Sequence, residues 1–227
     1  YYEEALTLDT GYCNPFRLET IPVLERASEL FPESWKPHYY LGNLLYEKQP
    51  DNALAEWKKV IEIAPENAMA WRNIGWYWWL YAKDYKESAK YYLKAIELDP
   101  SSALYLEEAD QVLEAAGESV QFRHDLLKSH HETAVKRYYP LAGEVITGMF
   151  TGDFDYILDL LENCYFPTRE GVANFHDIYM DALLLAGADK LARGDAEGAI
   201  ALYSKAFDYP ENHQVFLVDE RATHDAQ

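Results

Sequence analysis

The sequence has few cysteines, few basic residues and no long apolar run. Its two cysteines, Cys13 and Cys164, make no disulfide framework in a chain of 227 residues. Free cysteines favour a reducing compartment, so we expect a cytoplasmic protein. A membrane-spanning helix needs roughly 18 consecutive apolar residues, and no stretch of the sequence approaches that length. The sequence therefore predicts no membrane segment.

The shortage of positive charge also restricts the partners. Lysine and arginine number 20 against 39 acidic residues, which gives a net charge of −19. Such a surface repels phosphate groups, and this argues against nucleic acid and anionic membranes. A neutral or basic partner fits better. Intrinsic disorder is excluded as well, because 49% of the residues are hydrophobic and 15% are aromatic.

The chain repeats itself with a period of about 34 residues. The segment from Pro37 to Pro65 can be laid over the segment from Ala68 to Pro100. Apolar residues recur three and four apart in both segments, which predicts two short amphipathic helices joined by a turn. The matched pairs are Leu41 with Ile74, Gly42 with Gly75, Ala53 with Ser88, Trp57 with Tyr92, and Pro65 with Pro100.

The matched glycines indicate close packing between the two helices of a unit. Glycine inside a helix costs up to about 1 kcal/mol relative to alanine, and this cost is tolerable where a second helix must approach closely. We expect Ala53 and Ser88 to supply the matching small surface opposite Gly42 and Gly75. Proline ends each second helix, because it lacks an N–H group and clashes with the preceding turn.

This pattern resembles the tetratricopeptide (TPR) repeat, a helix–turn–helix unit with small residues at fixed positions and a closing proline. The resemblance implies an all-α, right-handed α-solenoid. The segment 14–25 (NPFRLETIPVLE) also resembles the repeat region of large bacterial proteins that carry a β-rich domain of unknown function.

We expect a fragment of a longer array, because the chain begins inside a repeat and ends without a capping helix. The expected divisions of this single array over 1–227 are an irregular repeat 1–33, TPR units 34–67 and 68–101, degenerate units 102–137 and 138–168, a TPR unit 172–212, and a tail 213–227.

A candidate binding strip follows from the same resemblance. In TPR arrays the first helices line the concave side, and aromatic and arginine side chains dominate binding hot spots. The residues that would face this side are Tyr39, Asn43, Tyr46, Arg72, Trp76 and Trp79. We therefore expect a non-catalytic scaffold that binds a protein or peptide. The alternatives are that these rings pack in the core or against other domains of a parent chain, that the module is an accessory, carbohydrate-binding part of a larger enzyme, and that the chain self-associates.

Catalysis has no convincing motif in this sequence. His124, His130 and His131 are interpreted as solvated, as are the carboxylates of 107–114. There is no glycine-rich phosphate loop, nucleophile elbow or zinc-binding helix motif. The carboxylate clamp of some TPR domains is not expected either, because Tyr39 stands where that clamp needs lysine and Glu108 stands where it needs a basic residue. No enzyme activity, cofactor or metal is predicted.

Overall fold

A computed structural model describes residues 2–8, 15–166, 174–208 and 210–213. None of these described residues lies in a β-strand. The chain divides into two compact units, Tyr1–Glu118 and Ser119–Gln227. Cys13 lies outside the described residues. No helix in the described ranges is both long and apolar enough to span a bilayer.

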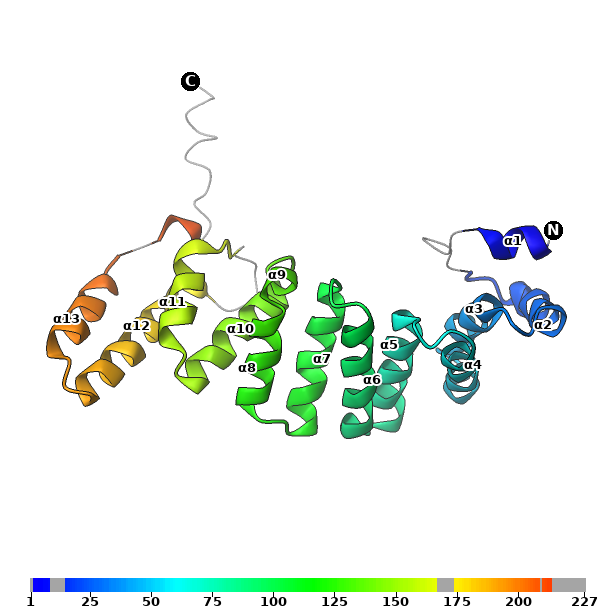
Figure 1. Cartoon of the computed structure of the whole chain (residues 1–227), viewed down its shortest axis with the longest axis horizontal. Helices are drawn as coiled ribbons and strands as arrows, with labels where there is room; N and C mark the ends of the chain where they lie inside the picture. Colours follow the sequence, from blue (N-terminus) through cyan, green and yellow to red (C-terminus); the bar gives the residue numbers. More distant parts are fainter. Residues whose placement is uncertain (1, 9–14, 167–173, 209, 214–227) are drawn as a thin grey trace, which may run out of the picture. The chain divides into compact units, whose positions relative to one another are not determined.

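The first unit consists of short helices that follow one another in sequence order (Figure 1). Helix α3 packs against α4, α5 against α6, and each pair packs against the next helix along the chain. This arrangement is the predicted one for residues 34–100. The helices of this unit are α1 (Tyr2–Thr7), η1 (Leu18–Thr20), α2 (Ile21–Leu30), α3 (Trp35–Leu45), α4 (Pro50–Ile63), α5 (Ala68–Tyr77), η2 (Trp78–Ala82), α6 (Tyr85–Leu98) and α7 (Ala103–Ala116).

At each of the two matched glycines, an aromatic ring of the second helix packs against the backbone of the first helix. A Cβ atom on Gly42 would lie 2.3 Å from Trp57 Nε1, and one on Gly75 would lie 2.8 Å from Tyr92 Cδ2. Trp57 and Tyr92 are the matched aromatic pair of the sequence repeat. Glycine is therefore needed at both positions chiefly because a side chain there would collide with these rings. The small residue Ser88 contributes differently, because its Oγ donates a 2.8 Å hydrogen bond to the carbonyl of Gly75.

The first helix of the second matched segment, α5, has an irregular end. After Tyr77 the helix continues as the π-helix η2, and Lys83 then adopts a left-handed conformation with φ of 57°. Left-handed backbone favours glycine. The corresponding turns after α7, α10 and α12 place glycine there, at Gly117, Gly152 and Gly194.

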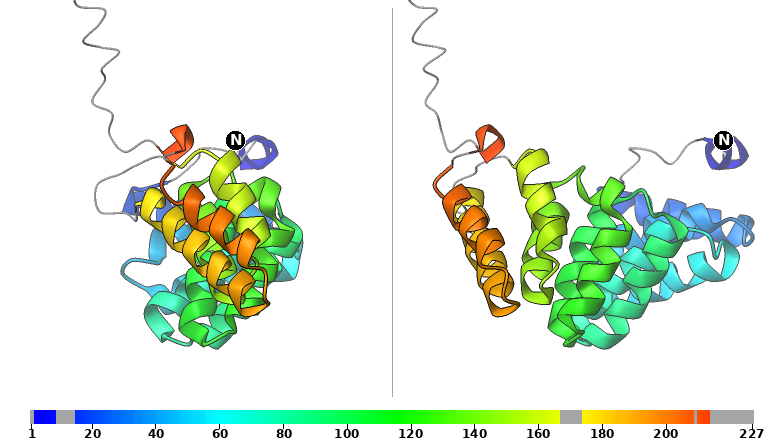
Figure 2. Two further views of the ribbon diagram at one scale, coloured as in Figure 1. Left: turned by 90° about the vertical axis from the view of Figure 1, so that its left-hand side faces the viewer. Right: turned by 60° about the vertical axis from the view of Figure 1, so that its left-hand side comes forward.

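The second unit is built from helix pairs of the same kind (Figure 2). Helix α8 packs against α10, α10 against α11, α11 against α12, and α12 against α13. Its apolar core is centred on Ile157, Leu161 and Leu183, which are fully buried. The helices are α8 (Val120–Ser129), α9 (His131–Ala134), α10 (Tyr138–Thr151), α11 (Phe154–Asn163), α12 (Phe175–Ala192), α13 (Ala196–Lys205) and η3 (Glu211–His213).

Candidate functional site

The first unit contains a pocket of about 400 Å³ on the face predicted from the sequence. It lies between residues of α3 and α5, and Trp57 reaches it from α4 past Gly42. Five of the six candidate residues line this pocket together. The full lining is Pro15, Tyr39, Asn43, Tyr46, Trp57, Arg72, Asn73 and Trp76. These five side chains therefore border one cavity.

Trp79 is the candidate residue that does not line the pocket. Its ring packs edge-to-face against Trp76, with centroids 5.3 Å apart, and against Tyr92, with centroids 6.4 Å apart. The π-helix in this region directs Trp79 toward the packing between α5 and α6. Trp79 thus supports the wall that Trp76 forms.

A chain of hydrogen bonds fixes the orientation of the two asparagine amides in the pocket. Trp57 Nε1 donates to Asn43 Oδ1 at 3.1 Å, and Asn73 Nδ2 donates to the same oxygen at 3.1 Å. Arg72 Nη1 donates to Asn73 Oδ1 at 3.2 Å. Tryptophan and arginine can only donate, so both amides have one possible orientation. With both lone pairs of its oxygen used, Asn43 has only its amide N–H groups left to offer a ligand.

Arg72 is paired within the chain. Its Nε donates to Glu108 Oε2 of α7 at 2.6 Å, and its Nη2 donates to Glu108 Oε1, which makes a bidentate ion pair. Its guanidinium carbon also lies 4.7 Å from the centroid of the Trp76 ring. Burial opposes the charge of Arg72, but the bonds to Glu108 and the charge of that carboxylate outweigh burial and raise the pKa of Arg72.

Glu108 corrects one sequence interpretation. We expected the carboxylates of 107–114 to be solvated, but Glu108 is only 7% exposed. The charge it places in the interior is compensated by Arg72. Burial also raises the pKa of Tyr105 on the same helix to about 12. The repeat pattern gave no sign of the ion pair, because its partners are 36 residues apart.

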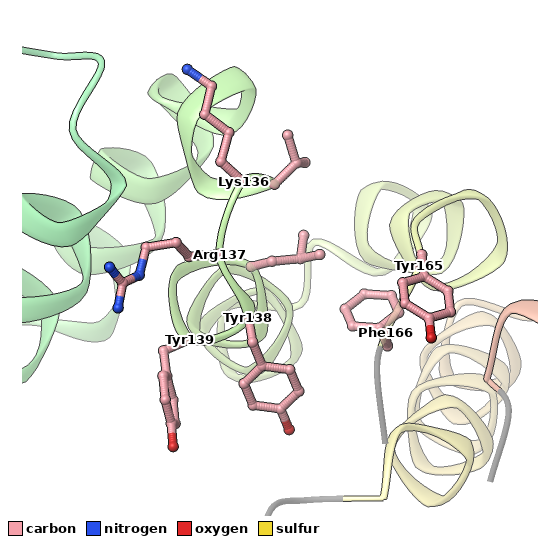
Figure 3. Close-up of a pocket in the computed structure, with 8 residues that line it drawn as sticks. Lys136, Arg137, Tyr138, Tyr139, Tyr165 and Phe166 are labelled. Carbon is pink, nitrogen blue, oxygen red and sulfur yellow. The ribbon is translucent and has the colours of Figure 1, made fainter. Parts of the chain in front are cut away.

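A second pocket of about 400 Å³ lies in the second unit. Its lining includes the adjacent cations Lys136 and Arg137. The other lining residues are aromatic or apolar and lie before and at the start of α10 and just after α11: Val135, Tyr138, Tyr139, Leu141, Tyr165 and Phe166. Figure 3 shows that Lys136 and Arg137 extend in different directions, both away from Tyr165 and Phe166. The two cations therefore do not converge on one ligand position.

The second unit also contains a polar cluster that sequence reasoning missed. His124 was expected to be solvated, but it is 1% exposed and lies 3.0 Å from Asp153 Oδ2 and 3.3 Å from Thr147 Oγ1. Gly148 provides the space, since a Cβ there would lie 2.9 Å from the histidine ring. Thr147 is buried, and its hydroxyl donates to the carbonyl of Gly143 at 2.7 Å. The hydroxyl is therefore not placed as a nucleophile.

Glu144 is the second charged group of this cluster. Its carboxylate is fully buried, accepts a hydrogen bond from Tyr156 Oη and lies 3.1 Å from His131 Nδ1. Burial and this bond raise the pKa of Tyr156. Within the described ranges, no group of three or more histidine, cysteine, aspartate or glutamate side chains could hold a metal ion. The cluster is thus a hydrogen-bonded link between helices.

Comparison with known proteins supports the fold. No protein-family model matches the sequence. The structure of YrrB, described as a TPR protein with an unusual peptide-binding site, is similar with a TM-score of 0.54 and 18% identity, over 91% of this chain and 98% of that chain. PilF of Pseudomonas aeruginosa is similar with a TM-score of 0.51 and 15% identity, over 92% of this chain and 89% of that chain. The chain therefore has the all-α fold of TPR solenoids, as the repeat predicted.

Proposed function

We propose that this chain is a protein-interaction module whose pocket between α3 and α5 binds an extended segment of a partner protein. The observation that carries the proposal is the fixed amide of Asn43. Its oxygen accepts from Trp57 and Asn73, so its N–H groups are the part left for a ligand. Amide N–H donors suit the main-chain carbonyl oxygens of an extended peptide, which has no internal hydrogen bonds to satisfy them.

The walls of the pocket support the same partner class. Tyr39, Tyr46 and Trp76 are partly exposed, and such rings offer large rigid contact area with a polar edge. The net charge of −19 favours a neutral or basic segment over an acidic one. The structural likeness to YrrB, which is described as having a peptide-binding site, agrees with this proposal.

Carbohydrate binding is the competing function for an aromatic pocket. Sugars stack on an open ring face, but Arg72 already covers one face of Trp76 at 4.7 Å. A peptide makes better use of the hydrogen-bond donors that remain. We also propose that the chain catalyses nothing itself, which agrees with the buried and hydrogen-bonded state of Thr147 beside His124.

Asn43→Asp is the sharpest test of the proposal. Aspartate keeps an oxygen for Trp57 and Asn73, but it replaces the N–H donors with a second, negatively charged oxygen. A random peptide library is displayed on phage and selected on the protein, and the dissociation constants of selected peptides are measured by fluorescence polarisation. We expect Asn43→Asp to weaken binding by about tenfold or more.

The matched control is Asn52→Asp, which makes the same change of charge at an exposed position of α4 outside the pocket. We expect it to bind selected peptides like the unchanged protein. The proposal is wrong if Asn43→Asp and Asn52→Asp bind every selected peptide equally well, or if no peptide is selected. Saturable binding of oligosaccharides that is lost in Asn43→Asp would favour the carbohydrate alternative.

A further inference from the structure

Arg72 is the cation among the residues that line the pocket, and it has its own carboxylate. Glu108 occupies the side-on fork formed by Nε and Nη2: its Oε2 accepts from Nε at 2.6 Å and its Oε1 accepts from Nη2. This is the bidentate geometry in which arginine holds the carboxylate of a bound ligand. Asn73 Oδ1 accepts a hydrogen bond from Nη1, and the guanidinium carbon lies over the Trp76 ring. Arg72 is thus held in place on several sides.

The ion pair of Arg72 and Glu108 is shielded from water, so the negative charge of Glu108 acts strongly on a ligand nearby. The side chain of Glu108 is 9% exposed and that of Arg72 is 22% exposed. Charges interact more strongly in such a place than on an open surface. A ligand carboxylate brought to Arg72 would find Nε and Nη2 already bonded to Glu108, and the negative charge of Glu108 would repel it.

We propose that Glu108 occupies the position that a ligand carboxylate would take on Arg72, and so sets the pocket to reject acidic segments and terminal carboxylates. The ligands that remain are neutral or basic stretches bound through their main chain. This inference rests on the proposed peptide-binding function and assigns the exclusion of acidic ligands to one residue, Glu108. Glu108 does not itself line the pocket, so it sets specificity through Arg72, whose Nε and Nη2 it occupies.

The test variant is Glu108→Gln. Glutamine has the same length and keeps an acceptor for Arg72, but it removes the negative charge. Arg72 then lacks a counter-charge, which a ligand carboxylate can supply. The matched control is Glu118→Gln, which removes one negative charge at an exposed position just after α7. It separates a local effect from the general loss of acidity.

The measurement uses peptides selected on the unchanged protein in the experiment above. Each position of a selected peptide is replaced in turn by asparagine and by aspartate, and the peptide is also made with an amidated and a free C-terminus. For the unchanged protein we expect at least one position, or the C-terminus, where the charged peptide binds about tenfold more weakly than its neutral twin. Glu108→Gln removes or reverses that preference, and Glu118→Gln keeps it.

Three outcomes overturn the inference. The first is that Glu108→Gln folds and keeps every charged-to-neutral ratio of the unchanged protein, which makes Glu108 a packing residue only. The second needs no variant and holds even if Glu108→Gln unfolds: the unchanged protein binds charged and neutral twins equally at every position. The third is that peptide binding is unaffected by Asn43→Asp, in which case the proposed function fails together with the inference. The first two outcomes leave peptide binding itself intact.

Discussion

Gly42→Ala tests the packing that forms the pocket. The added Cβ would lie 2.3 Å from Trp57 Nε1 and 2.5 Å from Trp57 Cδ1, so the indole must move. That movement strains or breaks the hydrogen bond from Trp57 to Asn43 Oδ1. The same change would be favourable in an isolated helix, because alanine is better than glycine there by about 1 kcal/mol.

The expected result is a net loss of stability. Overpacking of this kind costs about 1–3 kcal/mol, and loss of a hydrogen bond costs about 1 kcal/mol. After subtraction of the gain in helix propensity, the free energy of unfolding should fall by roughly 1–3 kcal/mol. Gly75→Ala should cost less, because its nearest ring atom is farther away at 2.8 Å. Gly75→Leu should cost about 1–3 kcal/mol.

The assay can follow the first unit alone. All six tryptophans of the chain lie between Trp35 and Trp79, inside this unit. Urea unfolding followed by tryptophan fluorescence therefore reports on the first unit, while far-ultraviolet circular dichroism reports on the whole chain. The close approach of Trp57 to the α3 backbone would be refuted if Gly42→Ala left the free energy of unfolding unchanged or raised it. It would also be refuted if Gly75→Ala lowered the free energy of unfolding more than Gly42→Ala does.

Three further predictions concern local strain, a buried carboxylate and a buried histidine. Lys83→Gly should stabilise the first unit by up to about 1 kcal/mol in the same fluorescence assay, because Lys83 has a φ of 57°; a loss of stability would contradict this. Tyr156→Phe should destabilise the second unit by about 1–3 kcal/mol, since it leaves the fully buried Glu144 with one donor fewer; an unchanged circular dichroism midpoint would speak against it. Burial lowers the pKa of His213 despite its hydrogen bond to the Leu161 carbonyl, so the folded protein favours the neutral imidazole. The contribution of His213 to stability is therefore complete above the ordinary histidine pKa of about 6.5 and is lost as the pH falls below that value. Hydrogen exchange of α11 measured above and below that pH checks the sign, and faster opening at the higher pH would reverse the argument.

The helix pairs and the face of the pocket could be predicted because both depend on local spacing. Tyr39, Asn43 and Tyr46 are four and three residues apart, so a helix must place them on one side. The matched glycines and aromatics of the repeat located the close helix contacts. Trp79 does not line the pocket with the other five candidates, because the π-helix after Tyr77 changes the angular position of the residues that follow.

The rest of the pocket depends on contacts between distant parts of the chain. Helical periodicity does not reveal which of 39 acidic residues pairs with Arg72, because the distance between α5 and α7 is set by packing. Trp57 belongs to a second helix and enters the pocket only because Gly42 leaves room for its ring. The burial of His124 had one available signal in the sequence, which is Gly148. This glycine leaves space for the His124 ring, as Gly42 leaves space for the Trp57 ring.

The indole N–H resonances of the protein test most directly whether a peptide binds between α3 and α5. A selected peptide is added to isotope-labelled protein, and the six indole signals are followed by nuclear magnetic resonance. Trp57 and Trp76 line the pocket, whereas the indole of Trp71 donates to the carbonyl of Pro65 at 2.8 Å outside it. We predict saturable shifts of the Trp57 and Trp76 signals with Trp71 unmoved. Shifts confined to Trp71, or to backbone amides of the second unit, would contradict the account.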